Sequence, residues 1–137
     1  FFLAWCDGLS DIQLDKMLDY HKSHGRLVTV AAVHPQSRFG IMEITNDQVT
    51  GFQEKPRVSD IWVNSGYSIL EPGALQYIHG DDDQWEIGPV SRLIDDRQLM
   101  AWRHEGHWQC MDTVSDWEYL EDLWVSGSAF WMPVQQS

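Results

Sequence analysis

The sequence contains few cysteines and no long apolar segment. Only Cys6 and Cys110 are present among 137 residues, which is too few for the disulfide framework of a small secreted domain. No apolar run approaches the roughly 20 residues that cross a bilayer, and the opening run at residues 1–5 lacks the basic start of a signal peptide. We therefore expect a soluble cytoplasmic protein with no membrane partner.

Basic residues are also scarce. Nine Lys and Arg residues stand against 21 Asp and Glu residues, which gives a formal net charge of −12. A polyanion such as DNA or RNA would be repelled by this charge, so we exclude nucleic acid as a partner. A small phosphorylated ligand remains compatible, because a few local cations and a divalent metal held by carboxylates can bind a phosphate inside an acidic protein.

No repeat, linker or low-complexity segment divides the chain, and its length suits one compact unit, so we expect a single domain over residues 1–137. The chain begins within an apolar run and has no polar lead-in. We interpret this start as an indication that the sequence is part of a longer protein.

The first third of the chain has the pattern of a strand, a helix and a second strand. Residues 1–6 are predicted to form a buried strand, and Ser10 or Asp11 could cap a helix that ends at Gly25. Residues 27–33 are rich in β-branched residues and are predicted to form a strand. Such a crossover unit implies parallel neighbouring strands, so the predicted class is α/β.

The remaining elements fit a mixed sheet with flanking helices. A hairpin is expected from residues 40–45 and 49–53 around a polar turn at 46–48, and Pro72 can begin a short helix. Further strands and helices are predicted at residues 62–70, 89–95, 98–104, 108–111 and 115–126, with 64–66 interrupting the first of these.

Two aspartates follow predicted strands, Asp7 after the first and Asp112 after the strand at 108–111. In an open α/β sheet, ligands bind at the carboxyl ends of strands. Two carboxylates there would suit a Mg²⁺ ion that also binds phosphate oxygens. The alternative is a pair of turn or capping aspartates.

A second group of polar residues surrounds the predicted hairpin. Glu54 and Lys55 follow it and offer a hydroxyl acceptor beside a phosphate partner, and Pro56 should hold Lys55 in an extended backbone. Asn64 and Gly66 add an amide and a close backbone approach, both useful against a sugar. Ordinary turn chemistry is the alternative for each.

Histidines provide a further candidate site. His104, His107 and Cys110 are spaced three apart, but on strands this spacing alternates faces, so the three side chains are not expected to converge on zinc. His21 and His24 lie three apart on the predicted helix and have no third partner. We expect them on a solvated face.

An ordered series of motifs resembles the glucose-1-phosphate cytidylyltransferase family of sugar nucleotidyltransferases. The motifs are Cys-Asp-Gly-Leu-Ser-Asp at 6–11, His-Lys-Ser-His-Gly at 21–25, Ala-Ala-Val-His-Pro at 31–35, Arg-Phe-Gly at 38–40, Phe-Gln-Glu-Lys-Pro at 52–56, Leu-Glu-Pro-Gly at 70–73 and His-Trp-Gln-Cys-Met-Asp-Thr at 107–113. The resemblance is colinear over nearly the whole chain.

The resemblance implies part of a Rossmann-like nucleotidyltransferase fold and a reaction of CTP with glucose 1-phosphate that gives CDP-glucose and pyrophosphate. By the same resemblance, Asp7 and Asp112 would be catalytic residues that hold Mg²⁺. The sugar and its phosphate would be bound by Glu54, Lys55, Asn64 and Gly66.

The family also carries a glycine-rich loop with a basic residue that binds the triphosphate, and no Gly-x-Gly stretch followed by Arg or Lys occurs in this sequence. We therefore expect a sugar-phosphate-binding, carboxyl-terminal portion that is inactive without the nucleotide-binding half. A non-catalytic binding or assembly module derived from a nucleotidyltransferase is the alternative.

Self-association is a further expectation. A fragment of an α/β sheet would leave an open edge and apolar faces, and eight tryptophans are available for an interface. We expect a homodimer or a higher homo-oligomer, since symmetric dimers are the commonest closed assembly.

Overall fold

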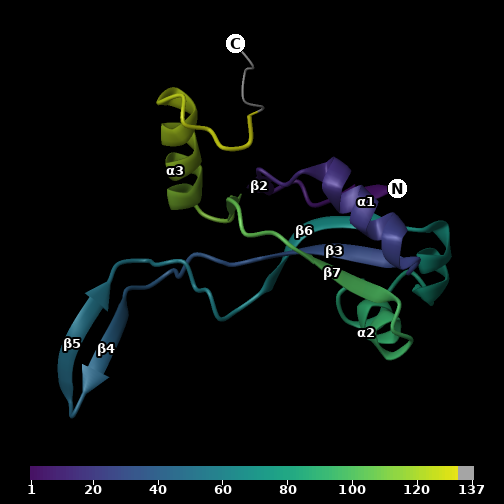
Figure 1. The fold of residues 1–137 in the computed structure, drawn as a ribbon, viewed down its shortest axis with the longest axis horizontal. Helices are drawn as coiled ribbons and strands as arrows, with labels where there is room; N and C mark the ends of the chain where they lie inside the picture. The colour runs from purple at the N-terminus through teal and green to yellow at the C-terminus, as the bar shows by residue number, and fades with distance from the viewer. Residues whose placement is uncertain (133–137) are drawn as a thin grey trace.

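The computed structural model describes residues 1–132, and its centre is a four-stranded mixed sheet (Figure 1). The strands lie in the order β1 (Phe2–Ala4), β6 (Val63–Leu70), β3 (Val28–Val33) and β7 (Leu99–Arg103). The strand β6 pairs antiparallel with both β1 and β3, whereas β3 pairs parallel with β7. The mixed α/β class expected from the sequence is thus confirmed.

The position of β6 corrects one expectation. The strands β1 and β3 were predicted to be parallel neighbours, but β6 lies between them and pairs with each. Both therefore run in the same direction without touching through hydrogen bonds. The parallel neighbour of β3 is β7 instead. Residues 64–66 lie within β6, and the expected irregularity is found there: the register against β3 shifts between the pairs Val30–Ser68 and Ala32–Asn64.

Helices cover both faces of the sheet (Figure 1). On one face, α1 (Leu14–His24) packs Met17 against residues of β3 and β6. On the other face, the short helix η1 (Pro72–Tyr77) and α2 (Gly88–Asp95) pack against Val28 and other buried residues. Successive strand residues point to opposite faces, so each strand contributes to both cores.

Helix α1 begins later than the sequence suggested. Its amino-terminal cap is Gln13, whose side chain makes no capping hydrogen bond, whereas Ser10 lies in a strand and Asp11 binds two histidines. The predicted end at Gly25 is confirmed, since this residue closes the helix in a left-handed conformation with φ of 64°. Glycine adopts that conformation without the strain that a Cβ would add.

A chain of hydrogen bonds joins α1 to the sheet and corrects the expectation of a solvated histidine face. The side chain of His21 is buried. The backbone N–H of Arg26 donates to His24 Nδ1 at 2.9 Å, and His24 Nε2 then donates to Thr29 Oγ1 at 2.7 Å. The Thr29 hydroxyl donates to His21 Nδ1 at 2.8 Å, and His21 Nε2 donates to Glu71 at 3.3 Å.

Each link of this chain is satisfied when both imidazoles are neutral. Burial lowers the pKa of His24, and the charge of Arg26, together with that of His21 when its ring is protonated, lowers it further. The sequence spacing showed the shared helical face of the histidines, but not that Thr29 lies beneath it.

A short antiparallel ribbon lies beside the sheet. It is formed by β2 (Gly8–Ser10) and β8 (Trp108–Cys110). Two aromatic side chains fasten it to the sheet: the Tyr67 hydroxyl donates to a carbonyl of β2 at 2.6 Å, and the Trp108 indole N–H donates to a carbonyl of β6 at 2.9 Å. The ribbon therefore has a fixed position relative to β6.

A hairpin projects away from the body of the molecule (Figure 1). It consists of β4 (Ile41–Thr45) and β5 (Gln48–Gln53), joined by Asn46 and Asp47 at φ values of 49° and 65°. Positive φ at both central residues is the requirement of a type I′ turn. The predicted hairpin is confirmed, with a turn one residue shorter than expected.

Helix α3 (Val114–Val125) stands apart from the sheet (Figure 1). It begins with a capping box in which the Thr113 and Asp116 side chains each bind the other's backbone N–H. Leu120 is its buried residue, whereas Trp117 and Trp124 remain exposed. Within residues 1–132, no helix combines the length and the apolar character needed to cross a membrane.

Candidate functional site

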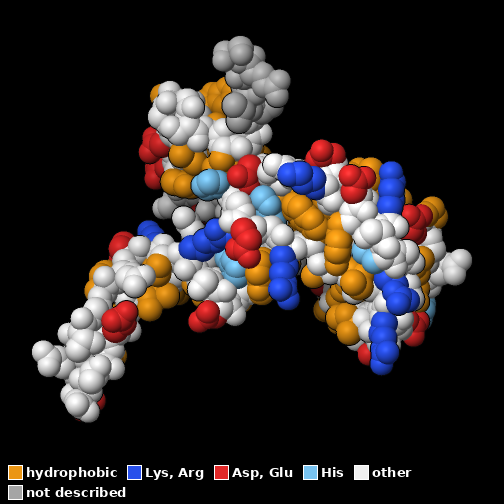
Figure 2. All heavy atoms as spheres, viewed as in Figure 1, with side chains coloured by type: hydrophobic (Ala, Val, Ile, Leu, Met, Phe, Trp, Pro, Cys, Tyr) orange, Lys and Arg blue, Asp and Glu red, His pale blue; other side chains and the backbone are white. Residues whose placement is uncertain are grey.

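A pocket of about 520 Å³ lies where the ribbon, the base of the hairpin and the start of α3 meet. Four segments contribute polar side chains to it: Arg38 from the loop between β3 and β4, Lys55 after β5, Asn64 from β6 and Asp112 after β8. Figure 2 shows Lys and Arg side chains beside carboxylates where the hairpin joins the body. The pocket thus combines both signs of charge.

Three of the six predicted site residues line this pocket, namely Lys55, Asn64 and Asp112. The other three, Asp7, Glu54 and Gly66, lie outside its lining. Glu54 is exposed and precedes Lys55 directly. What each of the six residues binds stays a prediction. Three of the six come from distant segments of the chain and meet in this pocket.

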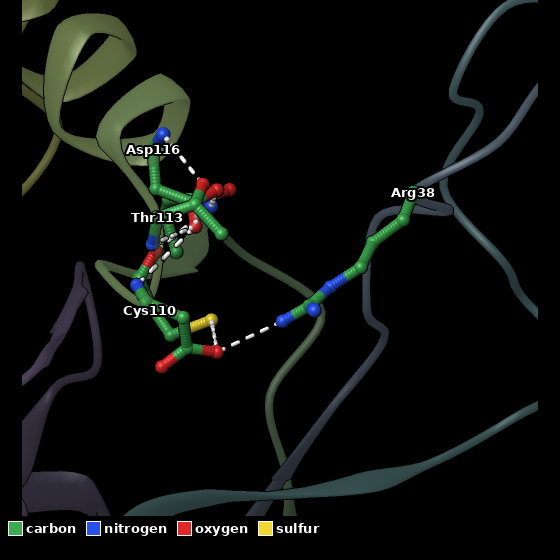
Figure 3. A network of polar contacts seen from close by, with 6 residues as sticks. Arg38, Cys110, Thr113 and Asp116 are labelled. Carbon is green, nitrogen blue, oxygen red and sulfur yellow. Dashed lines mark hydrogen bonds and ion pairs between the residues drawn. The ribbon is translucent and has the colours of Figure 1, made fainter.

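Figure 3 shows a polar network that contains Arg38, Cys110, Thr113 and Asp116, and the Asp112 carboxylate joins two of these residues. Its Oδ2 accepts from Arg38 at 2.9 Å and from the Cys110 thiol at 3.4 Å. Burial raises the pKa of Cys110, and the hydrogen bond and charge of Asp112 raise it further, to about 11. The thiol is therefore protonated at neutral pH and donates to the carboxylate.

The backbone of Asp7 pairs with that of Met111, the residue that precedes Asp112. The carbonyl of Asp7 accepts from the N–H of Met111 at 2.8 Å, which continues the pairing of Gly8 with Cys110 in the ribbon. The ribbon brings these two segments together, and the expected edge of the main sheet does not, because β8 is no part of that sheet.

The donor chemistry of the two aspartates fits magnesium. Mg²⁺ keeps several waters and binds through one or two carboxylates plus substrate phosphates, so two exposed carboxylates are a suitable set. Within residues 1–132, no group of three or more His, Cys, Asp or Glu side chains is arranged to hold a metal. A metal at Asp7 and Asp112 would therefore need oxygens from the substrate or from water.

The backbone at Lys55 corrects a further expectation. Pro56 was predicted to keep Lys55 extended, but Lys55 has φ of 44°. The chain turns sharply after β5 so that Arg57 can pair with Gln36, and the left-handed residue makes that turn. Non-glycine residues in this conformation are uncommon and cluster at functional sites. The turn brings Lys55 into the lining of the pocket.

Asn64 and Gly66 have a structural role beside any contact with a ligand. The Oδ1 of Asn64 accepts from the N–H of Gly66 at 2.9 Å. Gly66 has φ of 84°, and a Cβ there would lie 3.1 Å from the Cβ of Trp5. Only glycine fits this site without strain.

Sequence reasoning missed the cluster around Asp11. Its Oδ1 accepts from His104 Nε2 and from the backbone N–H of His107, both at 2.7 Å, and its Oδ2 lies 3.2 Å from His107 Nδ1. Burial alone would raise the pKa of Asp11, but the hydrogen bonds from His107 and His104 outweigh it and hold that pKa below its usual value.

The two histidines therefore converge, contrary to the alternation expected for strands, because the chain turns between them. Cys110, the third residue of the zinc set that the spacing argued against, does not join them, since it contacts Asp112. The signal available in the sequence was a pair of histidines flanking Glu105 and Gly106, but their partner Asp11 lies 93 and 96 residues before them.

Comparison with known proteins gives a consistent family. Residues 5–118 match a family model described as nucleotidyl transferase. The chain is 40% identical over 131 residues to a glucose-1-phosphate cytidylyltransferase of Salmonella typhimurium, with 96% of this chain and 51% of the relative covered. A probable glucose-1-phosphate cytidylyltransferase of Bacillus subtilis is 30% identical, with 96% and 52% covered. The chain spans about half the length of these relatives.

Solved structures share the fold. A putative glucose-1-phosphate thymidylyltransferase from Bacillus anthracis, in complex with a sucrose, aligns with a TM-score of 0.62 at 13% identity and covers 98% of this chain and 56% of that one. HddC from Yersinia pseudotuberculosis aligns with a TM-score of 0.57 at 17% identity, over 87% of this chain and 52% of that one.

Proposed function

Because the chain belongs to the nucleotidyl transferase family, we propose that it forms the sugar-phosphate and magnesium site of a glucose-1-phosphate cytidylyltransferase. The observation that carries this proposal is the convergence of Lys55, Asn64 and Asp112 on one pocket. These residues come from three separate segments, and each is a residue to which the family resemblance assigns a role.

The proposed roles follow from the chemistry of the side chains. Lys55 binds the phosphate as a point charge, and Glu54 accepts from sugar hydroxyls. Asn64 offers an amide beside the backbone of Gly66. The sugar-phosphate oxygen attacks the nucleotide in line, so the task of these residues is alignment.

Asp7 and Asp112 would hold Mg²⁺, which when bound neutralises phosphate charge. The free thiols and the relatives support a cytoplasmic location, which we also propose.

Calorimetric titration with glucose 1-phosphate tests the proposal. The chain should bind with a dissociation constant of about 1 µM to 1 mM in Mg²⁺, the usual range for enzyme substrates, and more weakly after EDTA treatment. Lys55→Gln should weaken binding about tenfold or more, because a charge-assisted contact is lost.

Lys22→Gln is the matched control, since Lys22 is exposed on α1 and lies outside the pocket. If wild-type chain shows no heat of binding up to 10 mM ligand, a concentration about ten times the upper end of that range, the proposal is wrong.

An assembly role is the second candidate, favoured by the apolar face of the hairpin. The cross-strand pairs Met42 with Phe52 and Ile44 with Val49 leave all four side chains more than half exposed. A two-stranded hairpin is only marginally stable in water without a covering surface. We propose that a second copy of the chain covers it in a homodimer or higher oligomer.

Sedimentation equilibrium at micromolar concentration tests the self-association. We expect an average mass near twice that of the chain, and Phe52→Asp should shift it towards the monomer because a charge enters the apolar face. Ile87→Asp, at another exposed apolar residue, is the control and should leave the mass unchanged. A monomer mass without concentration dependence would contradict this prediction.

A further inference from the structure

Arg38 also lines the pocket, and the roles proposed above do not include it. It comes from the loop between β3 and β4 and reaches across to Asp112, 74 residues away in the chain (Figure 3). The Arg38 side chain is 67% exposed and that of Asp112 is 43% exposed. Ion pairs between exposed side chains contribute little to stability and are screened by salt, so this contact can open easily.

Asp116, the other carboxylate in the lining of the pocket, already accepts hydrogen bonds from neighbouring residues. Asp116 Oδ2 accepts from the Thr113 N–H at 2.9 Å and hydroxyl at 2.8 Å, and its Oδ1 accepts from Gln109 at 3.0 Å. These bonds form the cap of α3 and would be lost if Asp116 turned to a ligand. Asp112 is therefore the carboxylate of this lining that a cation can approach, and Arg38 is already beside it.

A divalent cation and a guanidinium cannot share Asp112 without repulsion. Two positive groups at one carboxylate repel each other strongly at short distance. A cation at Asp112 would therefore displace Arg38, which would remain in a pocket whose proposed ligand is a phosphate. The planar guanidinium can bind two phosphate oxygens at once, and Lys55 from the same lining would hold the phosphate as a point charge.

We propose that Arg38 is a second phosphate-binding residue of this pocket, held by Asp112 in the ligand-free chain and released to the phosphate when Mg²⁺ binds. This inference rests on the proposed function and adds a coupling between its two ligands. Phosphate draws Arg38 from Asp112 and so favours the metal, and the metal favours phosphate by the same factor, because coupling between two sites is reciprocal.

Calorimetry of wild-type chain and Arg38→Gln tests the exchange with four titrations: MgCl₂ alone, glucose 1-phosphate alone, and each of the two ligands in the presence of the other. Arg38→Gln should bind Mg²⁺ alone about threefold more tightly or better, because a competitor is gone, whereas it should bind glucose 1-phosphate about tenfold more weakly. The coupling factor between the ligands should exceed about fivefold in the wild type and fall to about one in the variant.

Arg38→Lys keeps the charge without the planar pair of donors, and should recover part of the phosphate affinity but not all. Arg26→Gln is the control at an exposed arginine outside the pocket, and should match the wild type in every titration. Thermal unfolding of each variant reports whether the fold is kept.

A merely structural role of Arg38 would not make Arg38→Gln bind Mg²⁺ more tightly and glucose 1-phosphate more weakly. If Arg38→Gln weakens Mg²⁺ and glucose 1-phosphate alike, or changes neither, the exchange is wrong while the proposed function stands. If wild-type chain binds neither ligand, both the proposed function and this inference are wrong.

Discussion

The 137-residue chain should release no pyrophosphate from CTP and glucose 1-phosphate above the rate without protein. Positioning and charge neutralisation supply most of the catalysis of phosphoryl transfer, and both require that the triphosphate be held. The chain contains no glycine-rich loop with a following Arg or Lys that could hold it. The pocket that we propose would supply ligands for only one of the two substrates, so we expect the alignment for in-line attack to be missing.

A coupled pyrophosphate assay at saturating Mg²⁺ measures this directly. Addition of the part of the Salmonella typhimurium relative that the chain does not match should restore turnover if the two parts associate. Asp112→Asn in this mixture should abolish the restored rate. Turnover by the chain alone, lost in Asp112→Asn, would show that the triphosphate is bound by residues outside the family pattern.

Asp11→Ala should lower the free energy of unfolding by about 3 kcal/mol or more, the largest effect on stability that we expect. The Asp11 carboxylate accepts three hydrogen bonds from His104 and His107. Hydrogen bonds to a charged group contribute about 1.5–3 kcal/mol each, and His104 is buried, so its unpaired ring nitrogen would carry a desolvation penalty. The contact also ties β2 to the turn before β8.

Urea unfolding followed by tryptophan fluorescence measures this effect. Asp19→Ala, at an exposed acid on α1, should change the free energy by less than about 0.5 kcal/mol. The folded state lowers the pKa of Asp11 below 3.8, so its stabilisation is present above that pH and is lost as pH falls through the lower value. A loss of under about 1 kcal/mol at pH 7 for Asp11→Ala would show that the histidines find other partners.

Local chemistry allowed several elements to be predicted. Asn46 and Asp47 tolerate the positive φ that a two-residue hairpin needs, Gly25 ends α1, and Pro72 begins η1. Each of these signals acts within a few residues. The bounds of the elements were therefore close to those found.

Long-range pairing could not be predicted in the same way. The sequence gives no sign that β6 inserts between β1 and β3, or that β8 leaves the sheet to pair with β2. Both facts depend on which apolar strands meet, and several registers satisfy the same pattern of residues. The misplacement of Asp112 at the edge of the main sheet followed from this.

The candidate site shows the same difference between local and long-range information. Lys55, Asn64 and Asp112 were found through the resemblance to a family, which carries three-dimensional information that spacing lacks. The sequence did not indicate that Arg38 contacts Asp112 or that Asp11 binds His104, because these partners lie 74 and 93 residues apart in the chain. Close contacts of this kind become visible only in the folded chain.

Titration of ¹⁵N-labelled chain with glucose 1-phosphate in Mg²⁺, followed by amide chemical shifts, tests the central claim most directly. We expect the largest and saturable shifts around Arg38, Lys55, Asn64 and Asp112, which are among the residues that line the pocket. Shifts confined to another surface, such as that around Arg92, or no saturable shift at all, would contradict it.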